Sequence, residues 1–286
     1  MGHFANVNGV HCEIVGGRTS IDGIEREITL GKTSVNGIEY DIPFNRVIGK
    51  LPVGASVYAN FNGELKEFII VQQGLPSSMY SETCNDTWLL MKDIYDNMMW
   101  RSVINYPSFE FNTLSNQLLP LFGDEIKDKI KQVKIPYYTG RNKNAVYTGE
   151  DGMSVKLFFL SAKELGLDYD PPGSTNPNPQ PDDGTLLSYF DASYNDYANQ
   201  KRIAYWNYQP WDWWTRSIVT PGSSTVNKDQ NAITVKEDGT DSGEHIFDRV
   251  DYGDGSYATS SAKCGVRPAF ILPSETLVNY KYHILP

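Results

Sequence analysis

The chain has 286 residues, 40% of them hydrophobic, and a formal net charge of −10. Nucleic acids and anionic membrane surfaces attract basic proteins, so this charge argues against both as partners. Cys12, Cys84 and Cys264 lie far apart and form no CxxC pair, so we expect neither a disulfide framework nor a zinc site. We also expect no secretory signal, no membrane span and folding in a reducing cytoplasm.

A repeat with a period of 14 residues starts the chain, with copies that begin at Val7, Ile21 and Val35. Each copy holds Asn-Gly or Asp-Gly between β-branched residues, which predicts a short hairpin with a tight turn. Such a hairpin cannot bury its apolar side chains alone, so we expect residues 1–48 to form an assembly or attachment module. A small sheet that extends the main domain is the alternative. The residues expected to make the assembly contacts are Val7, Val10, Ile14, Ile21, Ile24, Ile28, Val35, Ile38 and Ile42.

Residues 49–286 predict one α+β domain with strands at both of its ends. The first strand patterns lie at 56–61 and 67–71, on either side of an Asn62-Gly63 turn. Apolar residues near helical spacing then predict a helix from Thr87 to Arg101.

A second helical stretch runs from Thr113 to Val133, where Pro120 and Gly123 predict two short helices. Apolar runs predict two later strands. The remaining segments, rich in Pro, Gly, Asp and Ser, predict surface loops with short strands at most. The later strands are expected at 155–160 and 266–272, the loops at 171–183 and 220–262, and the short strands at Val235 and Phe247.

Aromatic residues make up 13% of the chain, and they are densest between Tyr205 and Ser217. Aromatic side chains serve both in cores and in binding surfaces, so both roles are open. We expect the later residues of this stretch, and Arg267 further along the chain, to be structural. Arg216 and Arg267 should be buried against carbonyl or carboxylate groups. The residues of this core motif are Trp213, Trp214, Arg216 and Arg267.

The earlier aromatic residues of the stretch lie in an expected loop. Exposed rings there would suit stacking on a sugar or contact with a protein, with core packing as the alternative. The late loops add further candidates. The candidate ligand-binding residues are Trp206, Tyr208, Trp211, Tyr252, Asp254 and Tyr257.

Two late motifs, when they occur in this order, are together a fairly specific signal of a protein family. They are Trp213-Trp214-Thr215-Arg216-Ser217 and Gly265-Val266-Arg267-Pro268-Ala269-Phe270. Five earlier segments carry the same resemblance: Trp88-Leu89-Leu90, Trp100-Arg101, 113–118 with Phe122, 130–134 and 158–161. From about Val53 to Pro273, this order resembles the DUF6273 family of bacterial and phage proteins of unassigned function.

The two late motifs also resemble the end of the C-type-lectin-like fold shared by formylglycine-generating-enzyme relatives and phage variable adhesins. The resemblance implies a C-type-lectin-like body over residues 49–286, with two helical segments on a small antiparallel sheet and long loops. The 14-residue repeat resembles N-terminal modules of phage proteins. Together they imply a bacteriophage virion protein of the tail, baseplate, fibre or capsid surface, made in the cytoplasm of a bacterial host. Its expected partners are other virion proteins, further copies of itself, and a host-surface glycan or protein.

The sequence offers no recognised catalytic motif, and we expect a protein without enzymatic activity or cofactor. Formylglycine-generating enzymes use neighbouring cysteines late in the fold, where this chain has only Cys264. Loop carboxylates such as Asp238 and Asp241 could supply oxygen ligands to calcium, but they lack EF-hand spacing. A glycan hydrolase with two loop carboxylates remains an alternative, as does an architectural decoration protein without an external ligand.

Overall fold

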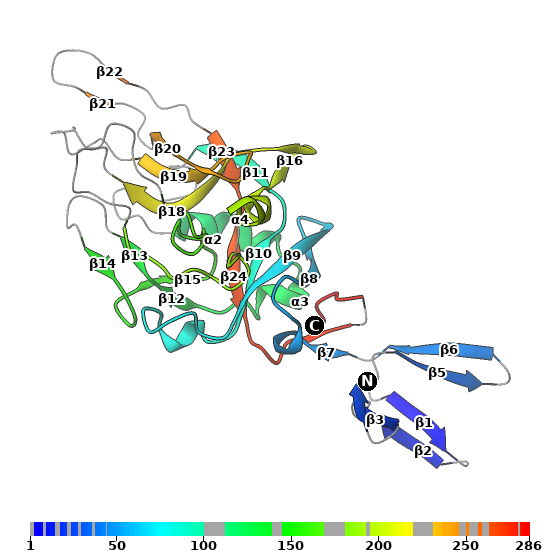
Figure 1. Ribbon diagram of the computed structural model, residues 1–286. Helices are drawn as coiled ribbons and strands as arrows, with labels where there is room; N and C mark the ends of the chain where they lie inside the picture. Colours follow the sequence, from blue (N-terminus) through cyan, green and yellow to red (C-terminus); the bar gives the residue numbers. More distant parts are fainter. Residues whose placement is uncertain are drawn as a thin grey trace.

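Three hairpins begin the chain in this computed structural model (Figure 1). The described residues are 3–7, 10–14, 18–21, 24–27, 30–35, 38–43, 45–99, 112–138, 145–168, 181–192, 195–219, 231–245, 250–251, 257–258, 263–279 and 281–286. The hairpins consist of β1 (His3–Val7) with β2 (Val10–Ile14), β3 (Arg18–Ile21) with β4 (Ile24–Glu27), and β5 (Leu30–Val35) with β6 (Ile38–Pro43).

In each of these hairpins, the last paired residues lie on either side of the repeated Asn-Gly or Asp-Gly dipeptide. Val7 pairs with Val10, Ile21 with Ile24, and Val35 with Ile38, so two residues separate the strands of each hairpin. Of the residues expected to make assembly contacts, Ile28 lies outside the described part of the chain, and the others lie in these strands. Their role in assembly stays a prediction.

The first sheet of the body has four antiparallel strands. Its strands, in spatial order, are β24 (Ala269–Leu272), β10 (Thr87–Met91), β9 (Glu64–Gln73) and β8 (Ser56–Phe61). The predicted turn between β8 and β9 is confirmed, because Asn62 and Gly63 both have positive φ, 53° and 78°. Such angles are typical of the tight turns that join twisted strands.

The helix predicted from Thr87 to Arg101 is wrong, because the described part of this segment forms β10 and then β11 (Asp96–Met99). β10 pairs with β9 on one side and with β24 on the other, and all five of its residues are buried. A strand covered on both faces has no polar alternation, so its short apolar run resembles part of a buried helix.

The second helical stretch is confirmed as short helices around Pro120 and Gly123. They are α2 (Asn112–Leu118), the 3-10 turn Leu119–Leu121 and α3 (Asp124–Lys127). The stretch ends before Val133, where β12 (Val133–Ile135) begins. A further helix, α4 (Asn195–Arg202), was not predicted, because its sequence NDYANQKR offers no apolar stripe.

The second sheet of the body has five strands (Figure 1). Its strand pairs are antiparallel except β18 with β23, which are parallel. The predicted final strand 266–272 is split, because β23 joins this sheet and β24 the first sheet, with Arg267 and Pro268 between them. The strands in spatial order are β11, β23 (Lys263–Val266), β18 (Trp213–Val219), β19 (Asn231–Val235) and β20 (Asp241–His245).

Small two-stranded pairs complete the body. The strand expected at 155–160 is wrong in its bounds: β15 ends at Val155, and beyond it only Phe158 forms an isolated bridge, with Ala269. Phe247 lies outside the described residues. The pairs are β7 (Arg46–Val47) with β25 (Leu277–Val278), β12 with β15 (Met153–Val155), β13 (Tyr137–Tyr138) with β14 (Val146–Tyr147), β16 (Tyr205–Trp206) with β17 (Gln209–Pro210), and β21 (Val250–Asp251) with β22 (Tyr257–Ala258).

The body is thus a mixed α+β fold of mostly antiparallel strands with few helices, as predicted at this level. Its core includes Phe61, Phe68, Phe122 and Phe270, whose rings contact one another edge to face or stacked. No helix among the described residues is long and apolar enough to cross a membrane.

Candidate functional site: an exposed aromatic hairpin

The short hairpin β16–β17 carries an exposed aromatic surface. Tyr205 pairs with Pro210 and Trp206 with Gln209, which leaves Asn207 and Tyr208 to close the turn. The side chain of Tyr208 is 95% exposed, the largest exposure among the exposed large hydrophobic residues of the described chain. We use the name aromatic hairpin for residues 205–211.

The backbone of Tyr208 is strained. Asn207 and Tyr208 have φ angles of 50° and 65°, in the left-handed region. Asn enters this region easily, whereas a bulky side chain does so at a cost of about 1–2 kcal/mol. The turn at Asn62-Gly63 has the same pair of positive angles, and there glycine occupies the second position. The aromatic hairpin therefore accepts strain at the residue that it exposes most.

Two tryptophans support the tip of the hairpin. The ring centroids of Trp206 and Trp211 lie 5.2 Å apart with an interplanar angle of 57°. Trp206 is partly buried against the core, and Trp211 is 36% exposed. Trp206 therefore anchors the pair, while Trp211 presents part of its ring to solvent.

Backbone hydrogen bonds fix the hairpin to the body at both ends. The N–H of Ile94 donates to the carbonyl of Tyr205 at 3.0 Å, and the N–H of Trp211 donates to Ala204 at 3.0 Å. The next carbonyl, that of Asp212, accepts from the N–H of Gly265 at 2.7 Å. The aromatic side chains thus stand on a fixed base, which lowers the entropy cost of binding a ligand.

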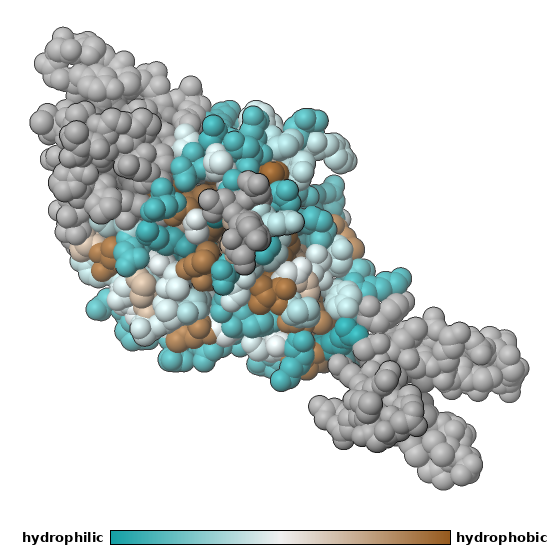
Figure 2. Space-filling view, in the orientation of Figure 1, coloured by the Kyte–Doolittle hydropathy of each residue, from teal (hydrophilic) through white to brown (hydrophobic). Residues whose placement is uncertain are grey.

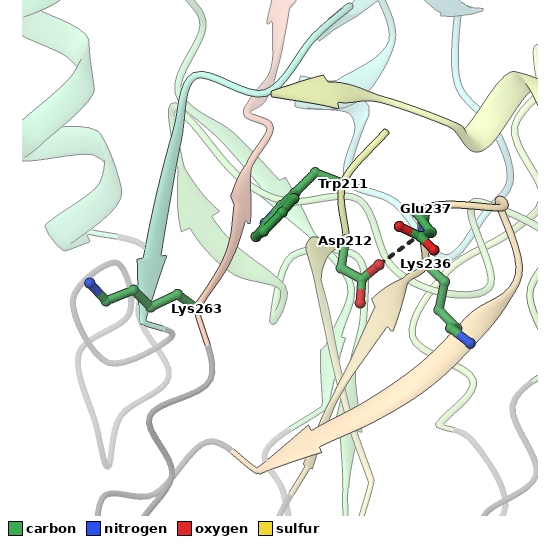
Figure 3. A pocket seen from close by; sticks show the side chains of 5 residues that line it. All are labelled: Trp211, Asp212, Lys236, Glu237 and Lys263. Atoms are coloured by element: carbon green, nitrogen blue, oxygen red, sulfur yellow. Dashed lines mark hydrogen bonds between the residues drawn. The ribbon is translucent and has the colours of Figure 1, made fainter. Parts of the chain in front are cut away.

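Two hollows flank the aromatic hairpin. The first has a volume of about 280 Å³ and is drawn in Figure 3. In this hollow the carboxylate of Asp212 accepts a hydrogen bond from the backbone N–H of Glu237 at 2.8 Å, and burial raises the pKa of Asp212. Its lining residues are Trp211, Asp212, Lys236, Glu237 and Lys263.

The second hollow has a volume of about 550 Å³ and lies on the β16 side of the hairpin. Its lining residues are Lys66, Asp93, Ile94, Tyr95, Tyr205, Trp206, Asn207 and Tyr208. On the face drawn in Figure 2, hydrophobic residues are scattered among polar ones. The candidate site therefore combines aromatic rings with the charged side chains that line the two hollows.

A buried ion pair joins Arg216, which follows the aromatic hairpin in the sequence, to Glu164, which precedes it. Arg216 and Glu164 form two parallel hydrogen bonds of 2.5 and 2.6 Å. The guanidinium also donates to the carbonyls of Pro136, Phe159 and Asp183, which uses all five of its N–H groups. Burial alone would lower the pKa of Arg216, but the charge and hydrogen bonds of Glu164 raise it above its ordinary value.

The carboxylate of Glu164 is equally occupied. Its oxygens accept from the hydroxyl of Tyr80 at 2.7 Å and the N–H of Ser161 at 2.8 Å, besides the two bonds from Arg216. Burial, and then the charge of Glu164, raise the pKa of Tyr80. Because donors and acceptors are all used within the protein, this pair leaves no group for a ligand and is structural.

Asp183 extends this network. Its buried carboxylate accepts from the hydroxyl of Ser217, with oxygen–oxygen distances of 2.9 and 3.0 Å. Burial raises the pKa of Asp183 to about 6. The expectation of a surface loop up to Asp183 is therefore wrong at its end, where Asp183 lies in the core; residues 171–180 lie outside the described chain. Neither Asp183 nor Glu164 was predicted, because single carboxylates in loops follow no pattern.

Arg267 occupies the junction of the two sheets. Its Nε donates to the carbonyl of Met91 at 2.8 Å, and its guanidinium carbon lies 4.7 Å from the ring centroid of Trp213. Burial lowers the pKa of Arg267 to about 10, so it remains charged at neutral pH. Trp213 and Trp214 are fully buried. These residues hold the sheets together and are not available to a ligand.

The structure brings three of the six candidate ligand-binding residues together: Trp206, Tyr208 and Trp211. Tyr252 and Asp254 lie outside the described residues, and Tyr257 lies in β22, where its side chain is not described. Sequence reasoning missed Tyr205, which is 46% exposed on β16. Its place in the run of aromatic residues was the available signal. Within the described residues, no group of three or more His, Cys, Asp or Glu could hold a metal ion.

The fold and the site define an α+β domain with a closed, buried charge network and an exposed aromatic hairpin. The chain belongs to the family described as Domain of unknown function (DUF6273), whose sequence model matches residues 85–274, more than half of the chain. The resemblance seen in the sequence is confirmed at this level, although the matched region begins later than Val53. No curated protein and no solved structure matches the chain.

Proposed function

We propose that the chain is a binding protein of a bacteriophage particle, and that its aromatic hairpin contacts a glycan on the host surface. The observation that carries the proposal is the strained, exposed Tyr208 beside the Trp206–Trp211 pair. Planar aromatic side chains offer large contact area at low conformational cost, and their faces suit the C–H surfaces of sugar rings. The hairpin needs no catalytic group for this role.

The finer assignment of the fold and of the particle rests on sequence. The motifs at 213–217 and 265–270 support a C-type-lectin-like body, and the 14-residue repeat supports a virion protein. In this proposal residues 1–44 attach the chain to other copies or to another virion protein, and the body that begins with β7 faces the host.

A glycan array, with a wall-release assay on whole cells, tests the binding function. The purified chain should bind glycans without releasing wall fragments, and Tyr208→Ala should reduce binding. Tyr197→Ala is the matched control, because Tyr197 is 62% exposed but does not line either hollow. A chain that binds no glycan and still assembles into particles would favour the architectural alternative.

A glycan hydrolase is the second candidate, because Asp212 and Glu237 line the same hollow as Trp211 (Figure 3). Glycosidases use two carboxyl groups, one of which needs a raised pKa to act as an acid, and burial raises the pKa of Asp212. Release of wall fragments by the native chain, lost in Asp212→Asn, would establish this candidate against the binding proposal.

Deletion of residues 1–44 tests the attachment module. The deletion keeps Arg46 and Val47, which pair with Val278 and Leu277 and so belong to the body. The truncated chain should stay folded but lose oligomerisation or incorporation into particles. Normal incorporation of the truncated chain would contradict the proposed role of the repeat.

A further inference from the structure

The aromatic hairpin separates two hollows and contributes to both. Trp211 lines the hollow of about 280 Å³, and Trp206 and Tyr208 line the hollow of about 550 Å³. Because the rings of Trp206 and Trp211 lie only 5.2 Å apart, an aromatic bridge joins the two hollows. Each hollow is about as large as a small-molecule site, so each can accept part of a longer ligand.

The charges that line the hollows are balanced. Lys236, Lys263, Asp212 and Glu237 line the first hollow, and Lys66, whose ammonium group pairs with Glu64, lines the second with Asp93. A polyanion would meet as many repelling carboxylates as attracting ammonium groups. A hydroxyl group can donate to a carboxylate and accept from an ammonium group, so a neutral polyhydroxylated ligand uses both kinds of side chain.

We infer that the ligand is a neutral oligosaccharide that runs across the hairpin and occupies both hollows, with the Trp206–Trp211 bridge between them. A single terminal sugar would fill one hollow and leave the other unused. This inference rests on the proposed function, since it specifies the glycan that the same site binds.

An array of neutral bacterial-surface glycans, presented as mono- to hexasaccharides, tests the inference. Poly(glycerol phosphate) on the same array serves as the anionic probe. We expect neutral glycans to bind, with affinity that rises at least tenfold from the monosaccharide to the tetrasaccharide. Poly(glycerol phosphate) should bind more weakly than the best neutral glycan.

Trp211→Ala supplies the matched variant. It should remove the gain in affinity with chain length and leave short glycans bound through the hollow that Trp206 and Tyr208 line. Tyr197→Ala should keep the full gain. Melting temperatures of both variants, compared with that of the native chain, report whether they fold.

The outcomes separate the inference from the proposed function. Equal affinity for mono- and tetrasaccharides, or a preference for poly(glycerol phosphate), would overturn the inference while glycan binding stands. If Trp211→Ala folds and keeps the full gain with length, the bridge is also wrong. Binding of no glycan at all would overturn the proposed function and the inference with it.

Discussion

Residues 205–211 and residues 213–217 are neighbours in the chain and use the same aromatic residue types, but the fold treats them in opposite ways. Tyr208 is 95% exposed, whereas Trp213 and Trp214 are fully buried. The buried indole groups have hydrogen-bond acceptors, the carbonyls of Arg202 at 2.9 Å and Met98 at 2.8 Å. Trp213 and Trp214 therefore enter the core at places where the backbone provides a partner for the polar atom of the ring.

The two segments also differ in their contribution to the stability of the fold. In 213–217 the guanidinium of Arg216 donates to Glu164 and to backbone carbonyls, and the hydroxyl of Ser217 donates to Asp183. In 205–211 the backbone of Tyr208 is strained and its ring is left in solvent. The first segment therefore stabilises the fold, and the second presents a surface.

Breaking the buried ion pair should have the largest effect on stability. Glu164→Gln leaves the charge of Arg216 buried without its counter-ion, so we expect a loss of about 3–5 kcal/mol in the free energy of unfolding. Urea denaturation measures this loss. The control is Glu64→Gln, which removes the exposed pair with Lys66 and should leave the urea midpoint unchanged. If both variants unfold at the midpoint of the native chain, the buried pair does not hold the core.

Truncation of a core tryptophan should cost a similar or slightly smaller amount. Trp213→Ala or Trp214→Ala should destabilise the chain by about 3–5 kcal/mol, because each ring is fully buried. Trp211→Ala should cost clearly less, since its ring is partly in solvent. Thermal melting of the three variants ranks them. Equal losses for Trp211 and Trp213 would remove the distinction between the two segments.

The stability of the chain should depend on pH through Asp183. Its pKa in the folded chain, about 6, lies above the ordinary value of 3.8, so the folded state holds the proton more tightly than the unfolded state. The stability that this proton contributes is present below about pH 4 and is lost as the pH rises through 6. Urea midpoints at several pH values should therefore show the native chain weakening relative to Asp183→Asn over this range. Parallel pH profiles of the two proteins would contradict a raised pKa of Asp183 in the folded chain.

The sequence predicted the parts of the fold whose signals are local. The Asn62-Gly63 turn with β8 and β9, and the break of α2 and α3 around Pro120, depend on neighbouring residues only. β10 was mistaken for a helix, because both faces of this strand are buried, which removes the polar alternation that marks a strand.

The site was predictable only in part, for a related reason. The aromatic run identified Trp206, Tyr208 and Trp211, but their core packing and their exposure were both open until the fold showed which rings face solvent. The partners of Arg216 lie 52 and 33 residues away in the sequence, at Glu164 and Asp183, and no spacing connects them. Contacts between distant loops depend on the complete fold.

Tyr208→Gly tests whether the aromatic hairpin serves binding and not folding. Glycine adopts the left-handed turn without strain, as Gly63 does in the turn between β8 and β9. We expect the variant to be as stable as the native chain, or more stable by up to about 1 kcal/mol, in urea denaturation. We also expect at least a tenfold loss of affinity for the glycan that binds best on the array. A variant that is less stable than the native chain, or that binds this glycan equally well, would contradict the account.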